Sequence, residues 1–417
     1  MPEVKGFRAH RYVQSKVGSF DKVITPPFDV ISPEERTELM GYSPFNLTHL
    51  ILPEEKYGLN KYEAAAKDFE SFIAQGAIAQ DSEDSFYLLE QTFNDQDGVK
   101  HVRRGFFGVT KIPEPGVETV LGHERTFITK IQDRLALTRA TQANLGAVFA
   151  LYSDPDGVLH PFLDQMCERT EDMLAHTIDK VTQRIWRVPN DARVTNYLLD
   201  KKLYIADGHH RFATAVAYRD EMRAKEKPAG PRPYDYVLMG FVDMDDAGLL
   251  VYPAHRVLDP PAGFAADDFL AKLNRWFEVT PSGEDLAHEV RSAKGCAIGL
   301  AVKNGGRYLL KLRNIDRVEF LGADRGPAWR ELDVAILHRG IIERTLGLPE
   351  GAEFVYEHSA QKALDLVDSG QKGLAFILNA TLARQIQGCA EAKEPMPQKS
   401  TYIYPKLPSG AAINRVC

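Results

Sequence analysis

Short apolar runs and amphipathic stretches alternate along this chain, with turn residues between them. Apolar positions at 86–93 and 101–110 flank a polar turn at 94–98, which predicts a two-stranded hairpin. Apolar positions between 62 and 73 recur at helical spacing, which predicts a helix that ends near Gly76. Strands and helices that alternate in this way predict a mixed α/β fold.

The same patterns place further elements in the first 259 residues. Ser32, followed by a proline and two acids, predicts the start of a helix at residue 33. A second hairpin is predicted from the runs at 234–243 and 249–257. Strands are also predicted at 45–52, 146–152, 184–188 and 203–206, and a helix at 162–176.

Pro260-Pro-Ala-Gly263 is the best candidate for a linker, because prolines and a glycine interrupt regular structure. A chain of 417 residues exceeds the size at which one hydrophobic core keeps growing. We therefore expect two domains, at 1–259 and 264–417. The second continues as a smaller α/β domain, and its basic, β-prone tail at 399–406 could return to the first.

The composition is that of an ordinary globular protein. Hydrophobic residues make up 44% of the chain, and the formal net charge of −7 argues against general binding of nucleic acid. The sequence has no apolar run of about 18 residues and no signal-peptide pattern, so we expect a cytoplasmic protein without a membrane partner. The four cysteines form no CxxC pair, which favours reduced thiols over disulfides or zinc ligands.

The most informative segment is a turn between an apolar run and a helical pattern, formed by Asp207, Gly208, His209, His210 and Arg211. A helix N-terminus has unpaired backbone N–H groups, glycine permits close approach, and arginine is a bidentate donor. The turn therefore predicts a phosphate site. The alternative is a helix capped by Asp207 with histidines at the surface. Adjacent histidines lie about 100° apart on a helix, which disfavours a shared metal ion, and we predict no metal ligands.

A second candidate region is the cationic segment 100–139, which has eight Lys or Arg against four acids. Within it, Glu124 is a candidate base, because the adjacent Arg125 favours an ionised carboxylate. A surface charge cluster is the alternative. Asp29 is another candidate base, on a loop that two prolines make rigid.

Five further residues are candidates for binding a substrate. Arg139 and Gln142 are three apart on a predicted helix, so they share a face near the end of that helix. His255 lies on a predicted strand, where a lone histidine can equally be a core residue. The full set is His123, Arg139, Gln142, Asn144 and His255.

The whole chain resembles the DUF1015 family of uncharacterised proteins, on the motifs PPFDVIS, GHERT, RATQAN, LYIADGHHRFATA and KSTYIYPK. The DGHHR segment also resembles the phosphate-binding turn of the ParB/sulfiredoxin superfamily, which includes ParB CTPases, sulfiredoxins and free serine kinases. This resemblance implies a ParB/sulfiredoxin-like domain with a mixed sheet at 1–259. It also implies that the backbone of Gly208, His209 and His210 binds nucleotide phosphates and that Arg211 clamps their charge. Sulfiredoxin has a cysteine in this turn and the present chain has none, which disfavours that reaction.

The leading hypothesis is a nucleotide-dependent phosphotransferase, similar to a free serine kinase, that uses Mg²⁺ with ATP or ADP. Phosphoryl transfer mainly needs positioning and neutralised charge, which Arg125, Arg139 and Arg211 can supply. The expected partners are a nucleotide and a small hydroxylated metabolite, with homo-oligomerisation left open. The candidates for acid or base catalysis are Asp29, Glu124, Asp207 and His209.

Two other functions are compatible with the same residues. One is a nucleotide-binding or sensing module that uses the turn without transferring a phosphoryl group. The other is a metal-dependent hydrolase built on His123, His209, His210 and His255.

Overall fold

The computed structural model describes residues 1–283 and 285–417, and it confirms the predicted mixed α/β fold. The chain forms two compact units, which we call unit 1 (Met1–Gly122, Thr126–Leu250 and Pro405–Cys417) and unit 2 (His123–Arg125 and Val251–Tyr404). The division after Leu250 precedes the proposed linker at 260–263, and the last residues of the chain belong to unit 1. Within the described residues, none of the helices is long and apolar enough to cross a membrane.

Unit 1 is built on a mixed sheet of nine strands. In spatial order they are β6 (Val120–Leu121), β11 (Leu203–Asp207), β8 (Val148–Tyr152), β12 (Tyr236–Asp243), β5 (Lys100–Lys111), β4 (Ser85–Asn94), β10 (Thr182–Pro189) and β9 (Met173–His176), and β1 (Val4–Lys5) also pairs with β5. The hairpin of β4 and β5 confirms the prediction. β8 runs parallel to β12 and antiparallel to β11. β8 and β12 therefore finish at the opposite end of the sheet from β11.

Large apolar side chains from these strands form the core of unit 1. Phe86, Phe106 and Phe241 are buried on β4, β5 and β12, and the rings of Phe106 and Phe241 stack with their centroids 5.1 Å apart. Burying one such side chain stabilises the fold by about 1.5–3 kcal/mol. Leu203 and Ile205 of β11 belong to the same core, which fixes the strand that leads into the turn at 207–211.

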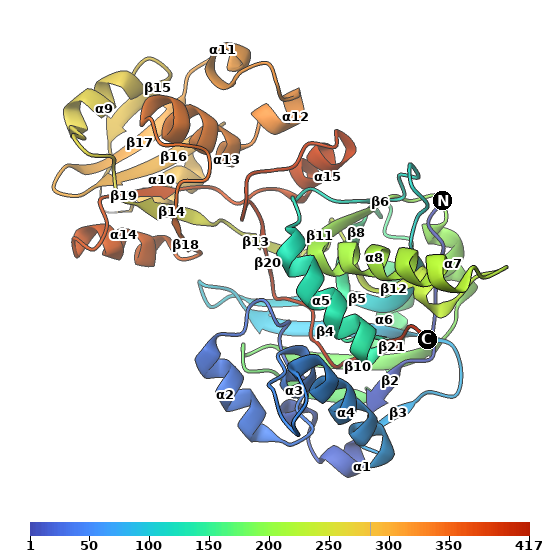
Figure 1. Ribbon diagram of the computed structural model, residues 1–417. Coiled ribbons are helices and arrows are strands. Elements are labelled where there is room, and N and C mark those ends of the chain that lie inside the picture. The colour runs from blue at the N-terminus through green and yellow to red at the C-terminus, as the bar shows by residue number, and fades with distance from the viewer. Residues whose placement is uncertain (284) are drawn as a thin grey trace. The chain divides into compact units, whose positions relative to one another are not determined.

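Helices α5 (Ile128–Thr141) and α8 (His209–Glu226) of unit 1 pack against each other, and α8 crosses the sheet directly after β11 (Figure 1). Ala215 on α8 reaches the core of the sheet. The other helices of unit 1 are α1 (Gln14–Val17), η1 (Phe20–Lys22), α2 (Pro33–Tyr42), α3 (Thr48–Ile51), α4 (Lys61–Ala74), α6 (His160–Cys167), α7 (Ala192–Leu198) and η2 (Pro233–Asp235).

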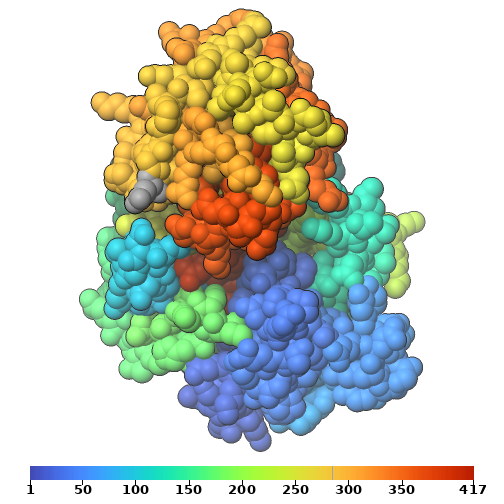
Figure 2. All heavy atoms as spheres, turned by 90° about the vertical axis from the view of Figure 1, so that its left-hand side faces the viewer, coloured from blue at the N-terminus to red at the C-terminus, as the bar shows by residue number. Residues whose placement is uncertain are grey.

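The beginning of the chain forms a helical segment of unit 1. The structure confirms the predicted start of α2, because the Ser32 hydroxyl accepts a hydrogen bond from the Glu35 amide while the Glu35 carboxylate accepts one from the Ser32 amide. Figure 2 shows this blue segment beside the green segment that contains β9 and β10. There the His176 amide donates to Asp21 Oδ1 at 2.6 Å. Nearby, β2 (His10–Tyr12) pairs with β3 (Ile78–Gln80).

The predicted strand at 45–52 is wrong, because Thr48–Ile51 form α3. The Asn46 side chain accepts a hydrogen bond from the Thr48 amide at 2.9 Å and donates to the Lys22 carbonyl at 2.7 Å. Such local bonds offer the backbone an alternative to pairing in a sheet. A short apolar run does not by itself distinguish a strand from a buried turn of helix.

Two further predictions, of where a helix ends and of how two strands pair, are also wrong. The helix predicted at 162–176 ends at Cys167, and Met173 begins β9. The hairpin predicted from 234–257 does not form, because β12 pairs with β5 and β8, whereas β13 (Leu250–Tyr252) pairs with β20 (Tyr402–Tyr404). Turn residues mark where a strand ends, but they do not determine which strand it pairs with.

Unit 2 has an antiparallel sheet in the order β15 (Phe277–Pro281), β17 (Gly306–Leu312), β16 (Ala297–Val302), β19 (Leu374–Ile377), β14 (His255–Leu258) and β18 (Val355–Glu357). Its helices are α9 (Ala266–Leu273), α10 (Leu286–Ser292), α11 (Arg317–Leu321), α12 (Pro327–Arg330), α13 (Asp333–Ala335), the π-helix η3 (Ile336–Thr345), α14 (Ala360–Asp368) and α15 (Ala383–Glu391). One core contains Trp276 and Phe320, whose rings stack, and a second contains Leu286 and Val290 of α10. The alternation of helices and strands predicted for this region is confirmed.

Candidate functional site

The turn at 207–211 joins β11 to α8. Gly208 is the N-cap of α8, with φ 90° and ψ 27°, a left-handed conformation that favours glycine. Asp207 is the last residue of β11 and does not cap α8. The alternative interpretation, in which Asp207 caps the helix, is therefore wrong. No described side chain caps α8. The turn therefore combines a helix N-terminus with a glycine, as an anion site requires.

Three charged side chains meet at the turn. Lys406 Nζ lies 2.6 Å from Asp207 Oδ1, and an Arg211 nitrogen donates to Asp207 Oδ2. The side chains of Lys406, Arg211 and Asp207 are 8%, 13% and 18% exposed. Two largely buried cations thus contact one carboxylate beside the positive end of α8.

The ionisation of Asp207 follows from these neighbours. Burial by itself would raise the pKa of the carboxyl, but the ammonium of Lys406 and the guanidinium of Arg211 hold its pKa well below the ordinary value. Asp207 is therefore a charged anchor for the two cations and a weak base.

The last segment of the chain brings Lys406 to the turn. Arg103 is buried on β5 and donates to the Pro405 carbonyl at 2.5 Å, and Gln91 on β4 donates to the Lys406 carbonyl at 2.9 Å. Beyond it, β21 (Asn414–Arg415) pairs with β7 (Ala143–Asn144). The tail is thus bound along unit 1 on both sides of Lys406.

The two histidines of the turn contact Gly122 and Phe127, which belong to the same unit. His209 is buried, and a Cβ added to Gly122 would lie 3.0 Å from its Cδ2 atom. The Phe127 amide donates to His210 Nε2 at 3.1 Å, and the Phe127 ring stacks on the His210 imidazole with the centroids 5.9 Å apart. Both imidazoles are therefore packed in place, and their predicted role toward phosphate stays a prediction.

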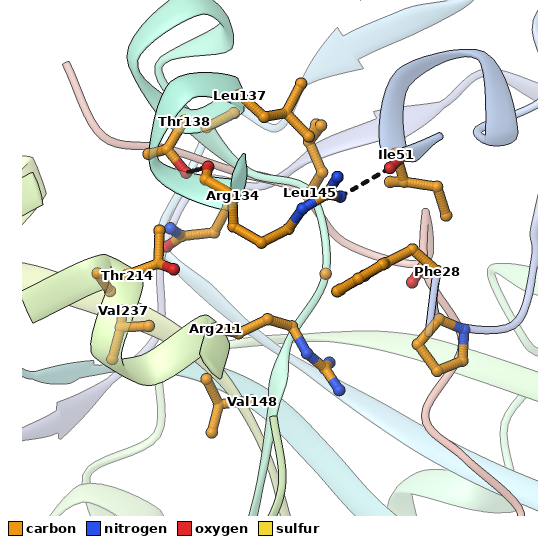
Figure 3. Close-up of a pocket in the computed structure, with 16 residues that line it drawn as sticks. Phe28, Ile51, Arg134, Leu137, Thr138, Leu145, Val148, Arg211, Thr214 and Val237 are labelled. Carbon is orange, nitrogen blue, oxygen red and sulfur yellow. Dashed lines mark hydrogen bonds between the residues drawn. The ribbon is translucent and has the colours of Figure 1, made fainter. Parts of the chain in front are cut away.

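A cavity lies beside Arg211 in unit 1 (Figure 3). The volume of this cavity is about 60 Å³. Several water molecules fit in it, because each needs roughly 10–15 Å³. In the view of Figure 3, Phe28 lies between the guanidinium groups of Arg134 and Arg211, and the Arg134 guanidinium is 4.3 Å from the ring centroid. The other lining residues are Pro27, Ile51, Leu137, Thr138, Ala143, Asn144, Leu145, Gly146, Val148, Thr214, Ala215, Val237 and Ser409.

Arg211 lies at both the turn and the cavity. Its guanidinium donates to the Ala147 carbonyl and to Asp207, whereas its Nε atom is buried without a hydrogen-bond partner among the described residues. A buried N–H without a partner costs about 1–3 kcal/mol. Arg211 therefore retains a donor for an additional acceptor.

Replacing Gly208 by alanine should destabilise unit 1 by about 1–2 kcal/mol for the left-handed backbone alone. The added Cβ would also lie 3.0 Å from Cζ and Nε of Arg211, so the guanidinium must move. Urea denaturation measures the loss of stability. Gly116→Ala is the matched control, because Gly116 has φ 84° and no atom within 4 Å of the added Cβ. Equal losses for the two variants would contradict the contact with Arg211.

Three predicted substrate-binding residues lie at or after the end of α5. Arg139 forms an exposed ion pair with Glu221 at 2.6 Å. Gln142 follows the helix with φ 49°, so it does not continue the face of Arg139 as predicted. Asn144 lines the cavity, and its Oδ1 accepts hydrogen bonds from the Leu238 amide and Asn414 Nδ2, both at 3.1 Å. Of the three, Asn144 is the one at the cavity.

The predicted GHERT candidates belong to unit 2. His123 is buried, and its Nε2 lies 3.3 Å from Thr401 Oγ1. Glu124 is half-buried, and Arg125 forms an exposed ion pair of 3.9 Å with Glu350. Their predicted roles stay predictions. Asp29 is exposed in unit 1, next to Phe28, which lines the cavity.

His255 also belongs to unit 2, as a buried residue of β14. Its Nδ1 accepts a hydrogen bond from the Leu378 amide at 3.1 Å. This nitrogen therefore has a structural role within unit 2. In the described residues, no three His, Cys, Asp or Glu side chains are placed to hold a metal ion. The four histidines proposed for a hydrolase thus do not form such a group.

His255 should make the stability of unit 2 depend on pH. Burial and then the charge of Arg256 lower the pKa of His255 to about 3. A folded pKa below the unfolded value of about 6.5 means that stability is complete above pH 6.5 and falls as the pH drops toward 3. His255→Asn retains an acceptor near Nδ1 but does not titrate. The slope of unfolding free energy between pH 6 and 4 should therefore decrease by about 1.4 kcal/mol per pH unit.

Urea denaturation at a series of pH values measures this slope. His288→Asn, which replaces an exposed histidine of unit 2, is the control and should leave the slope unchanged. An unchanged slope in His255→Asn would show that His255 does not titrate below its ordinary range.

Sequence reasoning missed Lys406, Phe28 and Ser409 as site residues. All three lie in or next to motifs that are visible in the sequence, PPFDVIS and KSTYIYPK. The motifs themselves could have marked these residues as candidates. Their position at the site could not be predicted, because only the fold brings Lys406 to Asp207.

Comparison with solved structures gives only distant similarities. A conserved hypothetical protein from Pyrococcus furiosus is 13% identical, with 70% of this chain and 90% of that chain covered and a TM-score of 0.34. A free serine kinase in complex with AMP is 12% identical, with 68% and 83% covered and a TM-score of 0.33. SbnI with a C-terminal truncation from Staphylococcus aureus is 10% identical, with 72% and 84% covered and a TM-score of 0.35. TM-scores this low carry no argument about function.

The sequence comparisons identify a family but no activity. None of the curated proteins matches the chain. The sequence model of DUF1015, described as a protein of unknown function, matches residues 4–335, which is most of the chain. The motifs at the turn and in the loop before Asp29 lie within the matched residues. The chain therefore belongs to the DUF1015 family.

Proposed function

We propose that this protein is a nucleotide-dependent phosphotransferase that acts on a small hydroxylated metabolite, such as a serine-like amino acid. One observation carries the proposal: the loop of Pro27 and Phe28 and the turn of Arg211, far apart in sequence, line one cavity of unit 1. The assignment of unit 1 to the ParB/sulfiredoxin-like fold is part of the proposal and rests on the DGHHR resemblance.

The nucleotide phosphates are proposed to bind at the start of α8. Arg211 and Lys406 supply two cations, both in contact with Asp207, and the helix N-terminus adds partial positive charge. In a site that is largely closed to water, such fixed charges stabilise a transferring phosphoryl group more strongly than in solution. Asp207 acts as a positioning residue, because it orients both cations.

The cavity is proposed to receive the acceptor. Its volume is well below the roughly 300–1,000 Å³ of sites for drug-sized ligands, so a whole nucleotide does not fit. The lining offers hydroxyl groups of Thr138, Thr214 and Ser409 among apolar side chains. This chemistry suits a compact polar metabolite whose hydroxyl group points toward the turn.

Asp29 is the proposed base. It is exposed and adjoins Phe28 at the cavity, whereas the ion pairs of Asp207 make that carboxylate a weak base. The acceptor oxygen attacks the terminal phosphorus as its proton moves to Asp29, and the bond from phosphorus to the nucleotide oxygen breaks. Mg²⁺ would enter with the nucleotide, with Asp29 as the candidate carboxylate of this chain to hold it, and would neutralise part of the phosphate charge.

The test is turnover by the purified full chain. The protein is incubated with Mg²⁺, L-serine or a mixture of hydroxylated amino acids, and ATP, ADP or CTP in turn. ³¹P NMR should then detect a new phosphomonoester. Asp29→Asn should lower kcat at least about 100-fold and leave the nucleotide Kd unchanged, since general bases contribute roughly 10²–10⁴-fold. Glu34→Gln, which changes an exposed acid on α2, is the control.

The outcomes separate the candidate functions. Saturable nucleotide binding without any product would favour a sensing module over a transferase. Neither binding nor turnover with the three nucleotides would refute the proposal. Turnover that Asp29→Asn leaves intact would retain the reaction but remove Asp29 as its base.

A further inference from the structure

A second cavity of unit 1 lies where β8 and β12 end. The two strands are parallel, and Tyr152 at the end of β8 is the register partner of Asp243 at the end of β12. Asp207 instead pairs with Phe149, near the beginning of β8. At about 3.3 Å per residue, Tyr152 lies roughly 10 Å further along the sheet than the turn. The two cavities are thus separate, and the second lies at the carboxyl ends of parallel strands, where α/β sheets commonly bind ligands.

This second cavity is acidic. Its volume is about 450 Å³, which is within the range found for small-molecule binding sites. Four aspartates line it against a single arginine, Arg104, which forms ion pairs with Glu90 at 2.8 Å and with one of the four, Asp164, at 2.6 Å. The lining residues are Val102, Arg104, Tyr152, His160, Leu163, Asp164, Asp243, Asp245, Asp246 and Ala247. The side chains leave a clear excess of negative charge.

Two of these carboxylates, the buried Asp243 and the half-buried Asp246, recover only part of their lost hydration. Asp243 accepts hydrogen bonds from the Asp154 amide at 3.0 Å and lies 3.1 Å from His160 Nε2. Asp246 Oδ1 accepts from the Gly248 amide at 2.7 Å. Burial nevertheless raises the pKa of Asp243 and of Asp246, because these donors do not replace all of the lost hydration. A bound cation would relieve that cost.

The hydroxyl of Tyr152 is an independent sign of a missing ligand. Tyr152 is fully buried and lines the cavity, yet its hydroxyl has no hydrogen-bond partner in the part of the chain that the structure describes. Buried polar atoms nearly always have a partner. Burial and then the nearby charges of Asp243 and Asp154 raise the pKa of Tyr152, so its hydroxyl stays protonated.

We propose that this cavity binds a small organic cation through a primary ammonium group. The ammonium donates to Asp243 and Asp246 and to the phenol oxygen of Tyr152, which is a good acceptor for N–H but a poor metal ligand while protonated. Each of these carboxylates already accepts hydrogen bonds from two backbone amides and keeps at least one lone pair for a further hydrogen-bond donor. In the described residues, no group of three potential ligands is arranged for a metal ion.

Putrescine is the probe, measured by isothermal titration calorimetry on the full chain at constant ionic strength. 1,4-Butanediol is the matched neutral ligand, and MgCl₂ tests the alternative of a metal site. Putrescine should bind saturably and butanediol should not. Tyr152→Phe removes only the hydroxyl and should weaken putrescine binding at least about tenfold, the effect of losing one hydrogen bond to a charged group.

Two variants serve as controls for this test. Tyr12→Phe removes a buried hydroxyl elsewhere in unit 1, one that donates to the Phe45 carbonyl, and should leave binding unchanged. Asp246→Asn should weaken putrescine binding, whereas Arg211→Ala should not, because the first cavity is separate. Absent binding of putrescine, equal affinity in Tyr152→Phe, or tighter binding of Mg²⁺ than of putrescine would each overturn the proposal.

Discussion

Arg211→Ala is expected to weaken nucleotide binding by at least about 100-fold. Among the five residues of the turn, Arg211 is the one that lines the first cavity, and its Nε is buried without a hydrogen-bond partner among the described residues. Two charge-assisted hydrogen bonds to phosphate contribute roughly 1.5–3 kcal/mol each, and 1.4 kcal/mol corresponds to tenfold in Kd. Calorimetric titration with ATP, ADP and CTP measures the change.

The controls distinguish a lost contact from a lost fold. Arg211→Lys keeps the charge without the bidentate fork and should bind more weakly than the native protein but more tightly than Arg211→Ala. Arg8→Ala removes an exposed arginine, 3.8 Å from Asp84, and should have no effect. Unchanged affinity in a folded Arg211→Ala protein would show that the turn does not bind phosphate.

Asp207→Asn is expected to lower the stability of unit 1 by about 3–5 kcal/mol, because it removes the negative charge that both Lys406 and Arg211 contact in a largely buried place. Urea denaturation measures the loss. Adding Lys406→Met to Asp207→Asn should recover part of it, since a largely buried cation that has lost this partner is then removed. Strictly additive effects of the two substitutions would contradict a direct interaction between these side chains.

The same ion pairs predict how acid affects the native protein. The pKa of Asp207 is depressed in the folded state, so its contribution is complete above the ordinary carboxyl pKa near 4 and is lost as the pH falls further. Asp207→Asn should therefore show a shallower decline of stability below about pH 4. An identical acid profile in the two proteins would show that Asp207 gains no stabilisation from its partners.

The sequence predicted most of the fold where structure is determined locally. The hairpin of β4 and β5 and the start of α2 at Ser32 depend on neighbouring residues, and both are confirmed. Pairing between distant segments could not be predicted in the same way. The end of β12 is marked by polar residues, but its pairing with β8 depends on the packing of the whole sheet.

In the candidate site, too, local features could be predicted from the sequence, whereas contacts between distant segments could not. Gly208 and Arg211 could be selected from the turn itself, because their chemistry and spacing suit an anion. The ion pair of Lys406 with Asp207 could not, because it joins the end of β11 to a tail about 200 residues later, which β4 and β5 hold in place through Gln91 and Arg103. Gln142 was misplaced because the end of α5 is set by a left-handed residue that is not glycine.

The return of the tail to unit 1 has a consequence for biosynthesis. Lys406 is translated about 200 residues after Asp207, which at roughly 5–20 residues per second corresponds to about 10–40 s. During that interval Val251–Tyr404, the larger part of unit 2, emerges, while the carboxylate at the start of α8 has Arg211 but lacks its second cation. That part of unit 2 can therefore begin to fold on the ribosome as a continuous stretch, whereas the anion site of unit 1 is completed only as synthesis ends.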